Sequence, residues 1–250
     1  MKEQYIGDIG DYGKYGLLRF LKDSGVSIGV NWYLTPYDGS SDGNRKEYLD
    51  VDTMRTYDDD VYIALRPIAD REDKTIHMIE SLDILRGIRF FNKLMDFDTV
   101  PWRDRQSARQ EWHRRAKKYL AGTEFIFADP DNGLLPERKK LSSKGAQKYI
   151  FAEEIIDYYT SGSQVMYYHH RSRRPIDEYL ADLRRIEKLI PGSRLIVLTF
   201  HRWSCRSYVF VIHDDQYIRY KEIIDRFLRS RWGTYKIGGN PAFTEEIIYS

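Results

Sequence analysis

Short strand-forming runs alternate along this chain with amphipathic helical patterns, and this alternation is the feature that most limits its fold. The clearest strand is predicted at 124–128, where Phe125-Ile126-Phe127-Ala128 carries no polar side chain. Such a run is typical of a strand covered on both faces. Further strands are predicted at 27–34, 88–94, 163–169, 194–200 and 207–212. Spacings of three and four predict helices at 11–22, 57–69, 73–86, 105–120, 142–159, 176–190 and 217–231.

This alternation predicts an α/β fold, with a doubly wound, mostly parallel, Rossmann-like sheet and helices on both faces. Only six residues separate the last two predicted strands. That is too short for a helical crossover, so these two strands should pair antiparallel. No Pro-, Gly- or Ser-rich linker divides the 250 residues. We therefore expect one domain (1–250), in which 1–26 is an N-terminal helical segment and 213–250 is a C-terminal helix and tail.

The composition argues against a secreted or membrane protein. Cys205 is the single cysteine, so the chain cannot form an intrachain disulfide. The first residues lack the apolar run of a signal peptide, and no stretch approaches the roughly 18 to 20 apolar residues of a membrane span. We therefore expect a cytoplasmic protein with no membrane role. The net charge of +2 identifies no partner, and the sequence does not specify an oligomeric state.

Three polar loops, at 35–44, 129–135 and 169–174, follow predicted parallel strands. Ligands of open α/β sheets bind beyond the carboxyl ends of such strands. In the second loop, Asp129-Pro130-Asp131-Asn132-Gly133 offers two carboxylates that could bind a metal, orient an amine or act as a base. Every residue of this loop also favours turns, so a simple strand-ending turn is the alternative interpretation.

Four glycines, Gly7, Gly10, Gly13 and Gly16, are spaced by threes before and within the first predicted helix. Because glycine has no side chain, this spacing predicts backbone packed closely against a ligand or against another part of the protein. The segment lacks the spacing and the Lys-Ser/Thr ending of a phosphate-binding P-loop.

Basic side chains follow the strand predicted at 163–169, in the order His169, His170, Arg171 and Arg173. Neighbouring strand residues point to opposite faces, so the two histidines cannot both bind one metal. The remaining His and Cys residues lack zinc-site spacing, and we predict no bound metal. A lone Cys205 is a weak candidate nucleophile, whereas Arg206 could reach a phosphate.

A second basic group is interleaved with three aromatic residues, Trp102, Trp112 and Tyr119. Such a pattern can hold phosphates and stack bases, or it can be a solvated helix face. The sequence leaves both interpretations open. The basic residues are Arg103, Arg105, Arg109, Arg114, Arg115, Lys117 and Lys118.

From about 28 to 212, the order of elements resembles class I S-adenosylmethionine-dependent methyltransferases, particularly the adenine-N6 nucleic-acid enzymes and their bacterial ribosomal-RNA relatives. The strand 125–128 leads into Asp129-Pro130, where these enzymes carry an Asp-Pro-Pro-Tyr motif. The helix beginning at Asp11 looks like the helix that precedes the cofactor strand in the ribosomal-RNA relatives. The chain departs from the pattern in two places: Thr35-Pro36-Tyr37-Asp38-Gly39 replaces a Gly-rich cofactor loop, and Asp131-Asn132 replaces the Pro-aromatic pair that stacks a flipped base.

The resemblance implies a methyltransferase, or a divergent homologue, that binds S-adenosylmethionine and acts on nucleic acid. Asp129 would orient the acceptor amine, with Asp131 and Asn132 beside it. The implied cofactor residues are Asp38, Gly39, Asp42 and Gly43. The implied substrate contacts are Lys14, His169, Arg171, Arg173 and Arg206.

Two other functions remain open. One is a magnesium-dependent nuclease or phosphoesterase built from aspartates, which convergence of at least three carboxylates would favour. The other is a non-catalytic module that binds nucleic acid or protein, which a pocket filled by the chain's own Tyr and Trp side chains would favour. The aspartates of the nuclease alternative are Asp8, Asp11, Asp38, Asp42, Asp129 and Asp131.

Overall fold

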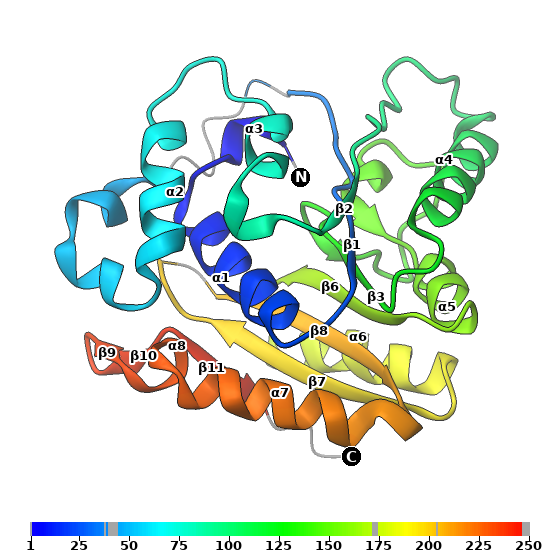
Figure 1. Cartoon of the computed structure of the whole chain (residues 1–250). Helices are drawn as coiled ribbons and strands as arrows, with labels where there is room; N and C mark the ends of the chain where they lie inside the picture. The colour runs from blue at the N-terminus through cyan, green and yellow to red at the C-terminus, as the bar shows by residue number, and fades with distance from the viewer. Residues whose placement is uncertain (1, 38, 40–44, 172–174, 204, 247–250) are drawn as a thin grey trace.

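A seven-stranded sheet forms the centre of the computed structural model, which describes residues 2–37, 39, 45–171, 175–203 and 205–246 (Figure 1). Its strand order is β11-β7-β8-β6-β3-β1-β2. The strands of this sheet are β1 (Ile28–Asn31), β2 (Arg89–Phe91), β3 (Phe125–Ala128), β6 (Gln164–His170), β7 (Ser193–Phe200), β8 (Arg206–His213) and β11 (Phe243–Glu246). Two smaller pairs are formed by β4 (Gly133–Leu134) with β5 (Tyr149–Ile150) and by β9 (Lys236–Ile237) with β10 (Asn240–Pro241).

The sheet is mixed rather than mostly parallel. Strands β2, β1, β3 and β6 pair in parallel, as expected. The β6–β8, β8–β7 and β7–β11 pairs are antiparallel. The predicted antiparallel pairing of the last two strands is confirmed, with Phe200 opposite Arg206. No sequence pattern predicted β11, which lies in the C-terminal region and pairs with β7.

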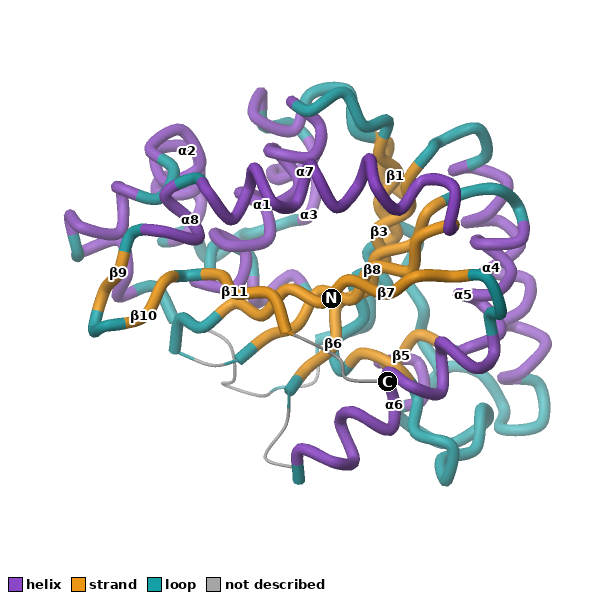
Figure 2. The backbone as a smooth tube through the Cα atoms, turned by 90° about the horizontal axis from the view of Figure 1, so that it is seen from below, coloured by secondary structure: helices purple, strands orange, loops and turns teal. Residues whose placement is uncertain are grey.

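Helices lie on both sides of the strands, as Figure 2 shows: α1, α2, α7 and α8 on one side, α4, α5 and α6 on the other. Buried side chains form a separate core on each side. None of the helices in the described ranges combines the length and the apolar character that a membrane-spanning helix requires. The helices are α1 (Ile9–Asp23), α2 (Asp59–Ala69), α3 (Ile76–Glu80), α4 (Arg105–Leu120), α5 (Ala152–Thr160), α6 (Ile176–Leu189), α7 (Tyr217–Arg229) and α8 (Arg231–Thr234).

Two predicted helices differ from the structure. The helix predicted at 142–159 begins only at Ala152. Before it, Gly145 adopts a left-handed φ of 79°, which an α-helix does not permit. A 3₁₀ turn, Ala146–Lys148, follows and leads into β5 beside β4. The helix predicted at 73–86 is divided into α3 and a 3₁₀ turn, Asp83–Leu85. In both segments, the apolar residues whose spacing predicted a helix pack against the rest of the protein without forming a continuous helix.

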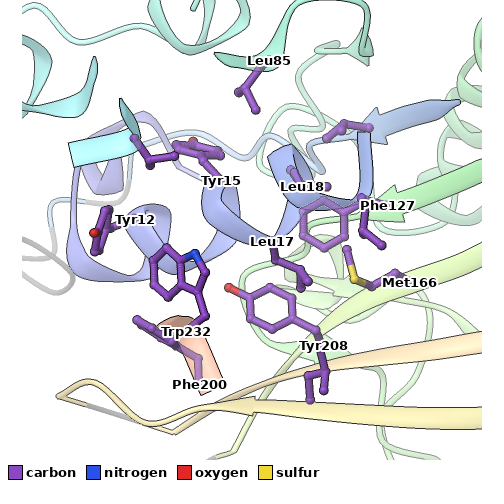
Figure 3. Packing of buried hydrophobic residues seen from close by; sticks show 14 of the residues in the cluster. Tyr12, Tyr15, Leu17, Leu18, Leu85, Phe127, Met166, Phe200, Tyr208 and Trp232 are labelled. Atoms are coloured by element: carbon purple, nitrogen blue, oxygen red, sulfur yellow. The ribbon is translucent and has the colours of Figure 1, made fainter. Parts of the chain in front are cut away.

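The glycine spacing of α1 is explained by close packing against the protein itself. A Cβ at Gly10 would lie 2.8 Å from Nε of Arg206, one at Gly13 would lie 2.8 Å from the ring of Phe200, and one at Gly16 would lie 2.3 Å from the ring of Trp232. Figure 3 shows Phe200 and Trp232 beneath α1. These three glycines therefore let the helix approach β7, β8 and α8 more closely than any other residue would.

This packing predicts the effect of Gly16→Ala. The added methyl group clashes with the buried ring of Trp232, so the free energy of unfolding should fall by about 1–3 kcal/mol despite the better helix propensity of alanine. Chemical denaturation measures the change. In a Trp232→Leu background the same substitution should cost much less, and an equal cost in both backgrounds would contradict this account.

Candidate functional site

A buried lysine between two carboxylates forms the centre of the candidate site. Nζ of Lys14 lies 2.9 Å from Oδ1 of Asp11 and 2.7 Å from Oδ2 of Asp129. The three side chains are only 7%, 2% and 4% exposed. Charged groups buried this deeply are tolerated because each is paired and hydrogen-bonded.

The start of α1 positions Asp11 and Lys14. Asp8 caps the helix, and its side chain accepts a hydrogen bond from the Asp11 backbone N–H at 2.9 Å. Asp11 in turn accepts from the Gly7 N–H at 3.0 Å. Lys14 is three residues after Asp11 and so lies on the same helix face. The helix start therefore delivers a carboxylate and an ammonium together to the end of β3, where Asp129 follows Ala128.

Arg206, at the start of β8, extends this group of charges. One of its guanidinium nitrogens lies 3.5 Å from Oδ2 of Asp8, and another donates to the Arg202 carbonyl at 3.3 Å. Asp8, Asp11, Asp129, Lys14 and Arg206 thus form one group, which we call the buried charge cluster. Three of its members are carboxylates and two are cations.

Aromatic rings enclose the buried charge cluster. Nζ of Lys14 lies 5.6 Å from the ring centre of Tyr15 and 5.7 Å from that of Trp32, distances at which a cation is attracted to a ring face. Tyr208 of β8 lies beneath α1 (Figure 3) and is fully buried. Its hydroxyl has no hydrogen-bond partner among the described residues. A buried hydroxyl left in this state beside Lys14 and Asp129 is a position that a water or ligand atom would satisfy.

Burial and pairing oppose each other in the pKa values of the cluster. Burial alone would lower the pKa of Lys14, but the carboxylates of Asp11 and Asp129 outweigh it and raise that pKa, so Lys14 stays an ammonium. Burial raises the pKa of Asp129, against the opposing effect of Lys14. Burial likewise raises the pKa of Asp8 to about 6, with Arg206 opposing.

The loop after β3 is tied to its neighbours by its own side chains. The Thr35 hydroxyl, beyond the end of β1, donates to Oδ2 of Asp131 at 3.1 Å. The backbone N–H of Asn132 donates to the Lys148 carbonyl at 2.9 Å. Gly133 has a φ of 92°, and a Cβ there would lie 2.3 Å from Nδ1 of His169. Asp131 and Asn132 are therefore held, half-exposed, at the edge of the sheet beside Asp129.

His169 supports this loop from inside the protein. It is fully buried, and its Nδ1 accepts a hydrogen bond from the Leu134 N–H at 3.1 Å. Its Nε2 lies 3.7 Å from Oδ2 of Asp182 on α6. Its ring packs against Tyr179. In this arrangement His169 orders the backbone next to the site, and a substrate would not reach it.

Of the other predicted site residues, three are paired with carboxylates, Gly39 is described without close neighbours, and four lie outside the described residues. Nη1 of Arg171 lies 2.8 Å from Oε1 of Glu246 on β11. Lys14 and Arg206 belong to the buried charge cluster. Gly39 has open space where a Cβ would lie. Asp38, Asp42, Gly43 and Arg173 lie outside the described residues.

The sequence did not indicate that Lys14 and Asp129 form a pair, because 115 positions separate them. The spacing of three between Asp11 and Lys14 was the local pattern that could have indicated the Asp11–Lys14 pair. Nor did it reveal that Arg109, placed in a basic helical segment, is 2% exposed. The guanidinium of Arg109 donates to both carboxylate oxygens of Glu154, at 2.5 and 2.8 Å, and stacks near Phe151. Arg109 therefore joins α4 to α5 and is no surface contact.

Three further observations bear on ligands. Among the described residues, no group of three or more His, Cys, Asp or Glu side chains is arranged to hold a metal ion. The ammonium of Lys14 lies between the carboxylates of Asp11 and Asp129. A pocket of about 280 Å³ lies between the segment after β4 and helices α5 and α6, and none of its lining residues belongs to the buried charge cluster.

Comparisons with known proteins do not assign a family. No family model matches the chain, and no curated protein matches it. Among the solved structures that match, a crystal structure of a DUF519 protein from Legionella pneumophila strain Philadelphia 1 aligns over 96% of each chain, with 10% identity and a TM-score of 0.47. A likeness this loose identifies neither a family nor an activity.

The raised pKa of Asp8 predicts how stability depends on pH. Between about pH 4 and pH 6, the unfolded chain has released the Asp8 proton while the folded chain still holds it. The unfolded state therefore binds fewer protons, and Asp8 makes stability fall as pH rises through this range. In Asp8→Asn the amide oxygen still caps α1 but does not titrate.

The unfolding free energy of Asp8→Asn relative to the wild type should therefore rise from pH 4 to pH 6, by up to about 3 kcal/mol, and level off above. The attraction of Arg206 for the ionised Asp8 is already contained in the Asp8 pKa of about 6, so it adds nothing further to this slope. Urea denaturation at a series of pH values measures it. Parallel curves for the two proteins across this range would contradict the prediction.

Proposed function

We propose that this protein is an S-adenosylmethionine-dependent methyltransferase, or a divergent homologue of that class, acting on nucleic acid. The observation that carries the proposal is the position of Asp129, held by Lys14 at the carboxyl end of β3. The carboxyl ends of parallel strands are where open α/β sheets bind ligands.

The connections of the sheet support a doubly wound interpretation. From β1 the chain reaches β2 through α2 and α3, whose buried residues belong to the same core as those of α1. From β2 it returns through α4, on the opposite core, to β3 on the other side of β1. The direction of winding therefore reverses between β1 and β3, and ligands bind at such a switch point.

The Thr35 to Asp131 hydrogen bond lies at this switch point, and Asp129 lies next to it. The antiparallel strands β8 and β7 follow β6 in the sheet, as the methyltransferase resemblance implies, and β11 is added outside them. In this interpretation Asn132 occupies the position of the tyrosine that stacks on the base in the Asp-Pro-Pro-Tyr motif.

The carboxylates at the switch point fit a cationic cofactor. The carboxylates of Asp8, Asp11, Asp129 and Asp131 lie at this edge of the sheet, with the cations Lys14 and Arg206 among them, and carboxylates can bind a cationic ligand. S-adenosylmethionine carries a net positive charge and supplies a methyl group already activated by its sulfonium. The unsatisfied Tyr208 hydroxyl is a further polar group available to a ligand or its water.

In this proposal the side chains of the site position the two reactants, and the reaction requires no metal ion. Lys14 holds the Asp129 carboxylate in one orientation, and a fixed carboxylate oxygen can accept a hydrogen bond from an exocyclic amine. Asn132 and Asp131, both half-exposed, lie where they would contact the same acceptor base. The surrounding rings exclude water and strengthen these interactions.

A non-catalytic binding module is the second candidate, and one observation favours it. Trp32 and Tyr33, directly after β1, are buried, one in each core. They occupy the strand end where a cofactor loop would begin. The nuclease alternative is less well supported, because the ammonium of Lys14 lies where a magnesium ion between Asp11 and Asp129 would bind.

Calorimetric titration with S-adenosylmethionine and, separately, with magnesium tests the proposal, together with transfer of labelled methyl groups to single-stranded RNA and DNA. We expect cofactor binding and methyl transfer that needs no magnesium. No cofactor binding and no transfer would overturn the proposal. Nucleic-acid binding alone would then indicate the binding module, and magnesium-dependent cleavage would indicate a nuclease.

Asp129→Asn tests the assigned residue. Methyl transfer should fall by about 100-fold or more, because the amide cannot replace the carboxylate as an acceptor of the same strength. Cofactor affinity should change little, and the melting temperature shows whether the fold survives removal of the Lys14 partner. Asp225→Asn on α7, an exchange of the same kind outside the site, should keep full activity. Equal activity in the two variants would contradict the role of Asp129.

A further inference from the structure

Two segments far apart in the sequence meet beside the candidate site. One is 135–148, the loop between β4 and β5, and the other is 97–105, which leads into α4. A guanidinium nitrogen of Arg105 donates to the Ser142 carbonyl at 3.3 Å. The Phe97 backbone N–H donates to the Gln147 side chain. Lys144 and Asp98 form an ion pair at 3.3 Å. We call the joined surface the basic ridge.

The ends of the 135–148 loop are fixed to the candidate site. Strands β4 and β5 pair in parallel, with Gly133 opposite Tyr149. The Asn132 N–H donates to the carbonyl of Lys148. The loop therefore leaves and returns at the residues that follow Asp129, so anything bound along it would extend toward the buried charge cluster.

The 135–148 loop is strongly basic and largely accessible. Glu137 is its single acidic residue, against Arg138, Lys139, Lys140, Lys144 and Lys148. Arg138, Lys140 and Lys144 are exposed. Arg138 and Lys140 form no ion pair with any described residue. Both side chains of the Lys144–Asp98 ion pair are exposed to solvent, so this pair contributes little to stability and is readily exchanged for a phosphate.

The cations that the sequence assigned to substrate binding are less available to a phosphate than those of the basic ridge. Lys14 is buried, the Arg206 side chain is only 12% exposed, and both are paired with carboxylates, as Arg171 is with Glu246. A phosphate would have to displace a carboxylate and enter the interior to reach the first two, at a high desolvation cost. The exposed side chains of the basic ridge pay no such cost.

Two further observations fit a nucleic-acid strand. Trp102, beside Arg103 on the second segment, is 69% exposed and could stack a base. Lys139 and Arg185 line the 280 Å³ pocket beside Leu135, Leu141 and Phe151. Burial and the nearby Lys148 lower the pKa of Lys139, and a bound phosphate would relieve that repulsion. The exposed carboxylate of Glu137 also lines this pocket.

We propose that the basic ridge binds the phosphate backbone of a single-stranded nucleic acid and leads it to the edge of the sheet at Asp129. This inference rests on the proposed function for the identity of the partner. Binding along the ridge requires neither the cofactor nor methyl transfer, so the two proposals can fail separately.

Fluorescence anisotropy with a labelled single-stranded RNA of about 20 nucleotides tests it, with DNA of the same sequence as a second arm. The variant is Arg138→Glu with Lys140→Glu. Its control is Arg229→Glu with Lys236→Glu, an equal charge change at exposed residues of α7 and β9 that have no ion pair among the described residues. Melting temperatures of both variants should match the wild type.

We expect the ridge variant to weaken binding at least about tenfold and the salt dependence of log K to flatten by about 1.4, for two lost phosphate contacts on a single strand. The nucleic-acid affinity of the control variant should remain within about twofold of that of the wild type. Equal weakening in both variants, no weakening in either, or no binding by the wild type at low salt would overturn the inference. Preference for RNA or DNA identifies the strand.

Cofactor titration of the ridge variant separates the two proposals. Retained cofactor binding with unchanged nucleic-acid binding would overturn the ridge and leave the proposed function standing. Loss of nucleic-acid binding in the ridge variant of a protein that never binds the cofactor would support the ridge and overturn the methyltransferase.

Discussion

The ammonium of Lys14 joins the first helix to the centre of the sheet, and much of the structure depends on this contact. It lies between Asp11 on the same helix and Asp129 at the end of β3, with all three side chains almost wholly buried. Burying three charges is costly, and the cost is offset only when the geometry of pairing is held closely. The cap at Asp8, the enclosing rings and the short β3 strand all serve to hold it.

Helix α1 can bring Lys14 to Asp129 only because it lies unusually close to the neighbouring elements. Gly10, Gly13 and Gly16 face Arg206, Phe200 and Trp232, and a methyl group at any of them would meet those side chains within 3 Å. Close packing of the helix and placement of the charge are therefore parts of one arrangement. The same contact brings Arg206 to Asp8, which extends the cluster to β8.

Charge is divided between the interior and the surface in a way that bears on function. The buried cations are committed to carboxylates, and this makes them suited to orienting Asp129 rather than to holding a strand. The exposed cations of the 135–148 loop lie on a segment whose ends are fixed next to Asn132. A site that positions a base and a separate surface that holds the backbone are both needed by an enzyme acting on nucleic acid.

Local sequence patterns predicted the α/β alternation, the strand at 124–128, the helix 105–120 and the antiparallel pairing of β7 with β8, because each follows from local periodicity or connection length. The sequence also showed the glycine spacing of the first helix, but not which residues pack against those glycines. The tertiary structure established that Phe200 and Trp232 pack against those glycines, that β11 completes the sheet, and that residues 142–151 are not α-helical. It alone paired Lys14 with Asp129 and Arg109 with Glu154, because contacts between residues 115 and 45 positions apart depend on how the elements pack, and local sequence patterns carry no record of that packing.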